Sequence, residues 1–105
     1  MISPSPKYLP PSLERPTKTE ILKKAIEHFG IDNQIDVAIE EMAELTQALI
    51  HYKRGRTANI EEEIADVYVM LQQIEMFFGS QYAVDTFREY KIERLALLLK
   101  KEGAL

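Results

Sequence analysis

Four acidic side chains have the spacing of metal ligands on two predicted helices. Glu41 and Glu44 are three residues apart in the segment E-E-M-A-E-L, and Glu63 and Asp66 are three apart in E-E-E-I-A-D-V. Residues three apart on a helix share one face, with Cβ atoms about 5–6 Å apart. If the two helices pack antiparallel through these faces, four carboxylates converge. Oxygen ligands carrying this much negative charge suit Mg²⁺, with Mn²⁺ as the other candidate.

These acids lie in phase with apolar residues. The pair Glu63 and Asp66 continues an apolar line on its helix: Val67, Met70, Ile74 and Phe77. The pair Glu41 and Glu44 shares a face with Val37 and Ala48. Two further acids fall on other faces and are expected at the surface: Glu61 and Glu62. A carboxylate on a packed face is costly unless it is paired or coordinates a metal, so we predict a metal site. The alternative is a set of ion pairs with Lys and Arg across the fold.

Four predicted helices position these acids. Each predicted start has a residue that commonly caps a helix: Thr17, Asp32, Asn59 and Ser80. The predicted ends fall near Phe29, Lys53, Phe78 and Lys101, and Gly30 is expected to end the first helix in the left-handed conformation. No strand alternation competes with helical spacing. We therefore predict an all-α fold that resembles a four-helix bundle.

The second predicted helix has a broad apolar arc: Ile35, Ile39, Met42, Leu45, Leu49 and Ile50. A helix with so wide an arc is expected to pack on more than one side. A chain of 105 residues buries a modest fraction of its surface. A second copy that completes the core is therefore part of the prediction.

Composition narrows the class of protein. All five prolines lie within residues 1–16, which we expect to form an extended or disordered arm before a single domain at 17–105. A formal charge of −4 argues against a nucleic-acid partner. The absence of cysteine excludes disulfides and thiolate zinc sites. No apolar run has the length of a signal peptide or membrane span, so the expected protein is cytoplasmic.

Other residues could complete a site. Arg88, Lys91 and Arg94 form a predicted basic ridge that suits phosphate oxygens, although charge balance near a helix end explains it equally well. Five aromatic residues could stack on a base, but this spacing is more typical of a core: Tyr52, Tyr68, Phe77, Phe78 and Tyr82. His28 and His51 are expected at the surface. Neither follows a glutamate by three residues, which disfavours a di-iron carboxylate site.

The order of these segments resembles a known signature. E-E-M-A-E, followed after eighteen residues by E-I-A-D, resembles the E-x-x-E…E-x-x-D signature of the MazG-like all-α nucleoside triphosphate pyrophosphohydrolases. The later K-I-E-R segment is similar to a lysine–arginine segment of those proteins, although Glu89 replaces their common asparagine.

This resemblance implies roles for individual residues. It implies that the four carboxylates hold Mg²⁺ and that Lys91 and Arg94 contact a triphosphate. Members of the superfamily cleave a nucleoside triphosphate to the monophosphate and pyrophosphate, and they function as dimers or tetramers.

The chemistry requires a proton acceptor for the attacking water, and Glu41 or its neighbour Glu40 could serve. Two other functions stay open at this stage. One is hydrolysis of phosphoribosyl-ATP, which related all-α enzymes perform. The other is a non-catalytic helical module that binds partners or oligomerises.

Overall fold

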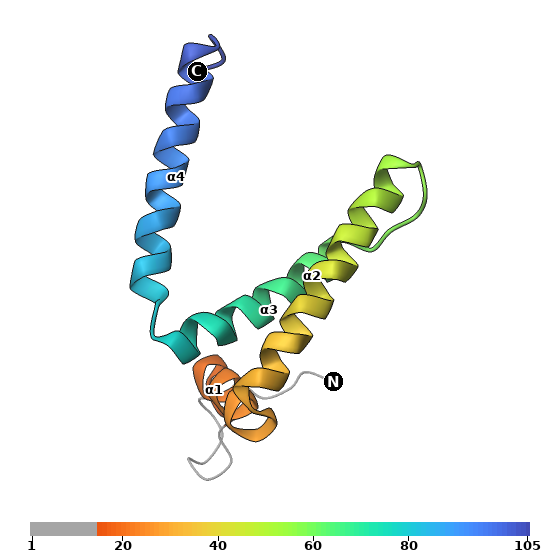
Figure 1. The fold of residues 1–105 in the computed structure, drawn as a ribbon, viewed down its shortest axis with the longest axis vertical. Helices are drawn as coiled ribbons and strands as arrows, with labels where there is room; N and C mark the ends of the chain where they lie inside the picture. Colours follow the sequence, from red (N-terminus) through yellow and green to blue (C-terminus); the bar gives the residue numbers. More distant parts are fainter. Residues whose placement is uncertain (1–14) are drawn as a thin grey trace, which may run out of the picture.

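Four α-helices account for most of the chain. The computed structural model describes residues 15–105, which contain no strand and four helices: α1 (Lys18–Phe29), α2 (Ile31–Lys53), α3 (Ile60–Phe78) and α4 (Gln81–Lys101) (Figure 1). The all-α prediction is confirmed. Most of the predicted 1–16 arm lies outside the described residues. Within 15–105, no helix combines the length and apolar character needed to cross a membrane.

Local sequence signals explain where α1 begins and α3 ends. The Glu20 N–H donates to Thr17 Oγ1 at 3.1 Å, so the predicted cap of α1 is confirmed. At the end of α3, Gly79 is left-handed, with φ 59° and ψ 36°. The Ser80 N–H then donates to the Glu75 carbonyl at 2.9 Å, which satisfies one of the last carbonyls of the helix.

Two predicted helix ends were wrong in detail. Gly30 has a positive φ of 87°, but its ψ of 145° is not that of the left-handed helical conformation, because the same residue ends α1 and begins α2. Consequently α2 starts at Ile31, and Asp32 lies in its first turn instead of capping it. Asn59 and Ser80 do occupy cap positions, but neither side chain makes a cap hydrogen bond.

Helices α1, α2 and α3 pack together. After the turn at 54–59, α3 returns along α2, and α1 contacts both of them at the opposite end (Figure 1). Within 15–105 the buried apolar residues are few: Ala38, Ala48, Val67 and Met70. A buried hydrogen bond from Gln34 Nε2 to Gln73 Oε1, at 2.7 Å, also joins α2 to α3.

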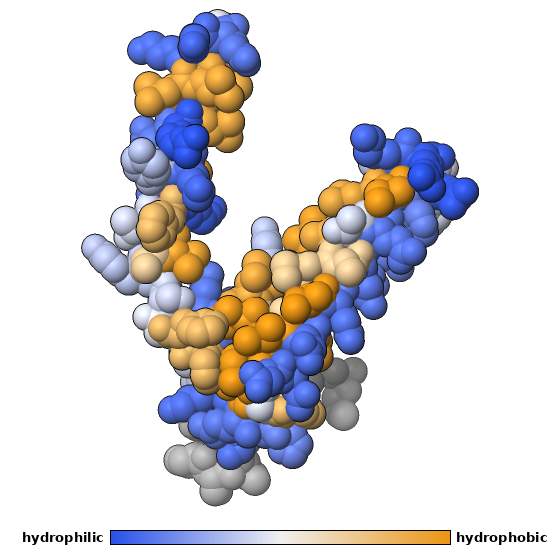
Figure 2. Space-filling view, viewed as in Figure 1, coloured by the Kyte–Doolittle hydropathy of each residue, from blue (hydrophilic) through white to orange (hydrophobic). Residues whose placement is uncertain are grey.

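Helix α4 stands apart from the other three. It contacts α3 but neither α1 nor α2, so a single chain does not close a four-helix bundle (Figure 1). Every residue of α4 except Ala96 is exposed. The Cα radius of gyration is 18.8 Å, against about 13 Å for a compact chain of this length. Apolar side chains are consequently visible on the surface of α2, α3 and α4 (Figure 2).

Candidate metal centre

Three carboxylates meet between α2 and α3. Glu41 and Glu44 of α2 and Glu63 of α3 each offer an oxygen, and these oxygens all lie within 4.8 Å of one another. The i, i+3 spacing aligns the first two, and the return of α3 along α2 brings the third to them. We call these three residues the acidic cluster.

Small residues allow the two helices to approach at this point. Ala48 of α2 is 8% exposed and lies one turn beyond Glu44, and Val67 of α3 is 8% exposed and lies one turn beyond Glu63. Glu41 and Glu63 are themselves half-buried, whereas Glu44 is exposed. The prediction that these acids lie in phase with packed residues is confirmed. Glu61 and Glu62 are exposed, also as predicted.

Two oxygens of the acidic cluster lack a partner. Glu41 Oε2 and Glu63 Oε2 are buried and accept no hydrogen bond. Within the described chain the one ion pair joins Lys24 to Glu27 on α1, at 3.9 Å, so no Lys or Arg there neutralises the cluster. A buried acceptor without a partner is costly, and a bound cation would remove that cost.

The environment favours protonation of two of these acids. Burial raises the pKa of Glu41 above its ordinary value, and repulsion from Glu44 raises it further. Burial, and then repulsion from Glu44, likewise raises the pKa of Glu63. A divalent cation would act in the opposite direction, because it stabilises the charged carboxylates.

The two other predicted carboxylates lie at the margin. Asp66 is near enough for its charge to raise the pKa of both Glu41 and Glu63, but it is not one of the three residues whose oxygens converge. Glu40 is exposed and stands outside the acidic cluster. The all-oxygen donor set and the two unpartnered oxygens fit Mg²⁺ or Mn²⁺.

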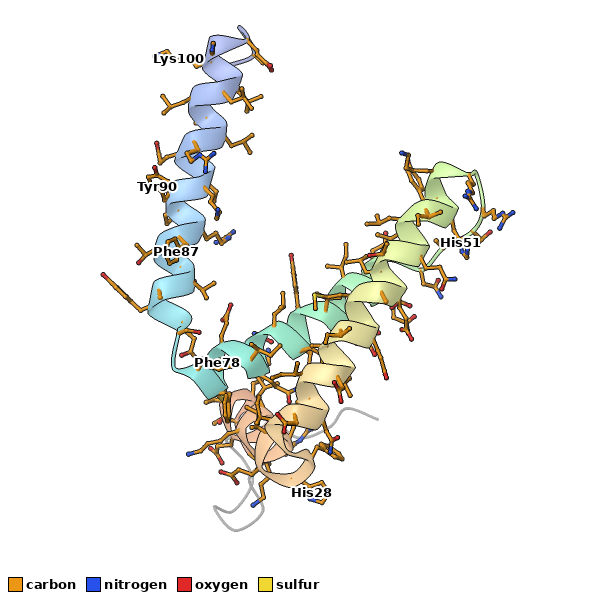
Figure 3. The ribbon with its side chains drawn as sticks, viewed as in Figure 1. His28, His51, Phe78, Phe87, Tyr90 and Lys100 are labelled. Carbon is orange, nitrogen blue, oxygen red and sulfur yellow. The ribbon has the colours of Figure 1, made fainter. Side chains whose placement is uncertain are left out.

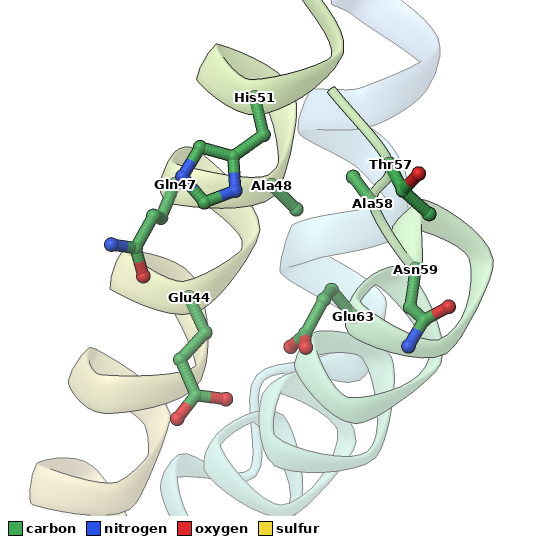
Figure 4. Close-up of a pocket in the computed structure, with 8 residues that line it drawn as sticks. All are labelled: Glu44, Gln47, Ala48, His51, Thr57, Ala58, Asn59 and Glu63. Atoms are coloured by element: carbon green, nitrogen blue, oxygen red, sulfur yellow. The ribbon is translucent and has the colours of Figure 1, made fainter.

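A pocket opens beside the acidic cluster, toward the α2–α3 turn. It has a volume of about 460 Å³ and is lined by Glu44, Gln47, Ala48, His51, Thr57, Ala58, Asn59 and Glu63 (Figure 4). The prediction of a plain surface role for His51 was wrong, since this half-buried ring lines the pocket. Its spacing from Glu44 and Gln47, at i, i+3 and i+7, was a usable signal for one shared helix face.

The predicted phosphate ligands lie on the separate helix. Lys91 and Arg94 are exposed on α4, which does not contact α2. Lys91 is roughly 15 Å along α4 from its start, and Asp66 is roughly 18 Å along α3 from its end. Since the two helices diverge after their shared turn, one chain does not bring the basic ridge to the acidic cluster (Figure 1).

Comparison with known proteins gave no match: no family model, no curated protein and no solved structure matches this chain. The resemblance to MazG-like proteins therefore stays a prediction. It rests on the two carboxylate pairs and on the K-I-E-R segment.

Proposed function

We propose that this protein is a Mg²⁺-dependent nucleotide pyrophosphohydrolase. In the proposed reaction, water attacks a phosphorus of a nucleoside triphosphate, a P–O bond breaks, and the products are the monophosphate and pyrophosphate. The observation that carries the proposal is the acidic cluster, with three carboxylate oxygens within 4.8 Å and two buried oxygens without a partner.

Individual residues have distinct roles in this proposal. Glu41, Glu44 and Glu63 would hold the metal, with Asp66 completing the set, and Mn²⁺ could replace Mg²⁺. When bound, the ion supplies neutralisation of phosphate oxygens and a more acidic water. A carboxylate then accepts the water's proton. Glu41 is the candidate because it belongs to the acidic cluster that would hold the metal and its water, and its neighbour Glu40 is the alternative.

The working enzyme in this proposal is a homodimer or homotetramer. On α4, Lys91 lines a shallow apolar groove with Val84, Phe87, Ile92 and Leu95. A partner that covered this groove would bury a lysine, and a buried lysine needs an acidic partner. The acidic cluster of a second copy has surplus negative charge. This complementarity supports an arrangement in which Lys91 and Arg94 of one copy face the carboxylates of the other.

Two alternative functions are supported by the same features of the structure. Phosphoribosyl-ATP is a triphosphate that the same carboxylates and basic ridge would accommodate. A non-catalytic module would use the exposed α4 for binding alone. Calorimetry separates the second alternative from an enzyme, since a partner module has no need to bind Mg²⁺ at the acidic cluster.

The test is pyrophosphate release from a panel of substrates. Canonical and modified NTPs and dNTPs, and phosphoribosyl-ATP, are incubated with Mg²⁺ and inorganic pyrophosphatase, and phosphate is detected with malachite green. Glu41→Gln and Asp66→Asn should each lower turnover by at least about 100-fold, with an unchanged helical CD spectrum. Glu61→Gln, on an exposed face, is the matched control. Full turnover in both the Glu41→Gln and the Asp66→Asn variants would refute the proposal.

A further inference from the structure

The pocket beside the acidic cluster changes chemical character along its length. The carboxylates of Glu44 and Glu63 lie on the side of the acidic cluster, with Asn59 beside Glu63, whereas His51, Thr57 and Ala58 lie toward the α2–α3 turn (Figure 4). No Lys or Arg lines it. With no side-chain cation among its walls, this part of the pocket is less suited to the phosphate chain of a nucleotide than to a neutral group.

Four lining side chains other than the two carboxylates can recognise a flat polar group. Gln47 and Asn59 carry carboxamides, which both donate and accept hydrogen bonds, and Thr57 adds a hydroxyl. His51 contributes a planar ring of the kind on which bases stack. Two small residues, Ala48 and Ala58, leave room between them. We call Gln47, His51, Thr57 and Asn59 the neutral pocket.

Asn59 leaves its carboxamide available to a ligand in the pocket. It occupies the N-cap position of α3, where an asparagine side chain usually accepts a hydrogen bond from the helix backbone. Here it makes no cap hydrogen bond, and its carboxamide is at the pocket instead (Figure 4). The pocket volume of about 460 Å³ also falls within the range of small-molecule sites.

We propose that the neutral pocket binds the nucleobase of the nucleotide whose phosphates face the acidic cluster. This inference rests on the proposed function and adds the residues that select the substrate. Gln47 and Asn59 read the hydrogen-bonding edge of the base, and His51 stacks on its face. These are specificity residues, because they lie beside the carboxylates and do not take part in the bond-breaking step.

Binding of unreactive ligands provides the test. Isothermal calorimetry with Mg²⁺ compares AMP, GMP, CMP and UMP with ribose 5-phosphate, which has the sugar and phosphate but no base. The full-length wild-type protein should bind at least one monophosphate more tightly than ribose 5-phosphate. His51→Ala and Gln47→Ala should each lower the affinity for that monophosphate by roughly tenfold and leave the affinity for ribose 5-phosphate unchanged.

Matched controls are available on other faces. His28→Ala removes the other histidine, at the distant end of α1, and Gln72→Ala removes an exposed glutamine of α3 (Figure 3). Neither should change either affinity. The inference is overturned if no monophosphate binds better than ribose 5-phosphate, or if His51→Ala and Gln47→Ala weaken both ligands equally. The binding result is independent of the turnover result that tests the proposed function, because a protein that releases no pyrophosphate can still bind or reject a base.

Discussion

At the scale of single residues, the carboxylates of the acidic cluster repel one another in the metal-free chain. Glu41 and Glu63 are half-buried and lie close to Glu44, and both have raised pKa values. An acid whose pKa is raised by folding binds its proton more tightly in the folded state. Its contribution to stability is therefore fully present below the unfolded pKa and is lost as pH rises through the folded pKa.

The raised pKa values predict a pH dependence of the melting temperature, and a variant that lacks both acids isolates it. In EDTA, the melting temperature of wild type should fall as pH rises from 4.5, the ordinary value for these groups, through their raised folded pKa values. The double variant Glu41→Gln/Glu63→Gln lacks both titrations, so its melting temperature should fall less over the same range. Thermal melts followed by CD make the measurement. Parallel pH profiles for the two proteins would contradict the assignment of raised pKa values.

The same repulsion predicts that a bound metal ion stabilises the fold at neutral pH. An ion that binds only the folded state stabilises it by about 2.7 kcal/mol at a concentration of 100 times Kd. Mg²⁺ should therefore raise the melting temperature of wild type in a concentration-dependent way. Glu44→Gln should remove most of the shift, because it deletes one ligand of the cluster. Glu61→Gln should retain it, and an equal shift in Glu44→Gln would exclude this residue as a ligand.

At the scale of helices, α2 and α3 are held in register by a buried polar contact as well as by small apolar residues. Gln34 and Gln73 are 7% and 3% exposed, and each would be an unsatisfied buried amide without the other. The contact lies toward the α1 end of the helix pair. It therefore helps to fix the axial position at which Glu63 meets Glu41 and Glu44.

A double-mutant cycle tests that register contact. Gln34→Leu should lower the free energy of unfolding by about 1–3 kcal/mol, because it leaves the Gln73 amide buried without its partner. Gln34→Leu/Gln73→Leu should recover part of this loss, since neither amide then remains. Urea denaturation gives both values, with exposed Gln72→Leu as the control. Strictly additive effects would show that the two amides do not depend on each other.

Sequence patterns predicted the helices well because capping and periodicity are local. The cap at Thr17 and the apolar phase around Glu63 depend on residues only a few positions away, and both predictions were confirmed. The conformation of Gly30 was wrong because it depends on two helices meeting at one residue. The position of His51 at a pocket was missed for a similar reason, since the lining also includes Thr57 and Ala58 of the turn and Asn59 and Glu63 beyond it.

At the scale of the whole molecule, the described chain leaves many large apolar side chains exposed. Phe87 and Tyr90 of α4 are 65% and 64% exposed and project from the helix into solvent (Figure 3). Exposed apolar surface on several helices is typical of an interface between subunits. The direction of α4 was beyond sequence patterns, because its apolar residues have no partner within the described chain.

Complementation between inactive variants tests whether that interface builds the site. Glu41→Gln disables the acidic cluster and Lys91→Ala disables the basic ridge, so each should be inactive alone. If the ridge of one copy serves the cluster of the other, a mixed dimer contains one intact site. Equal mixing, with subunit exchange confirmed by light scattering and mass spectrometry, should then restore about one quarter of wild-type activity. A mixture of Glu41→Gln and Asp66→Asn should stay inactive, because each chain then lacks one of its own proposed metal ligands. If subunits exchange but the first mixture stays inactive, the basic ridge does not serve the acidic cluster of the other copy. It would then serve the cluster of its own chain, which would require α4 to fold back onto α3.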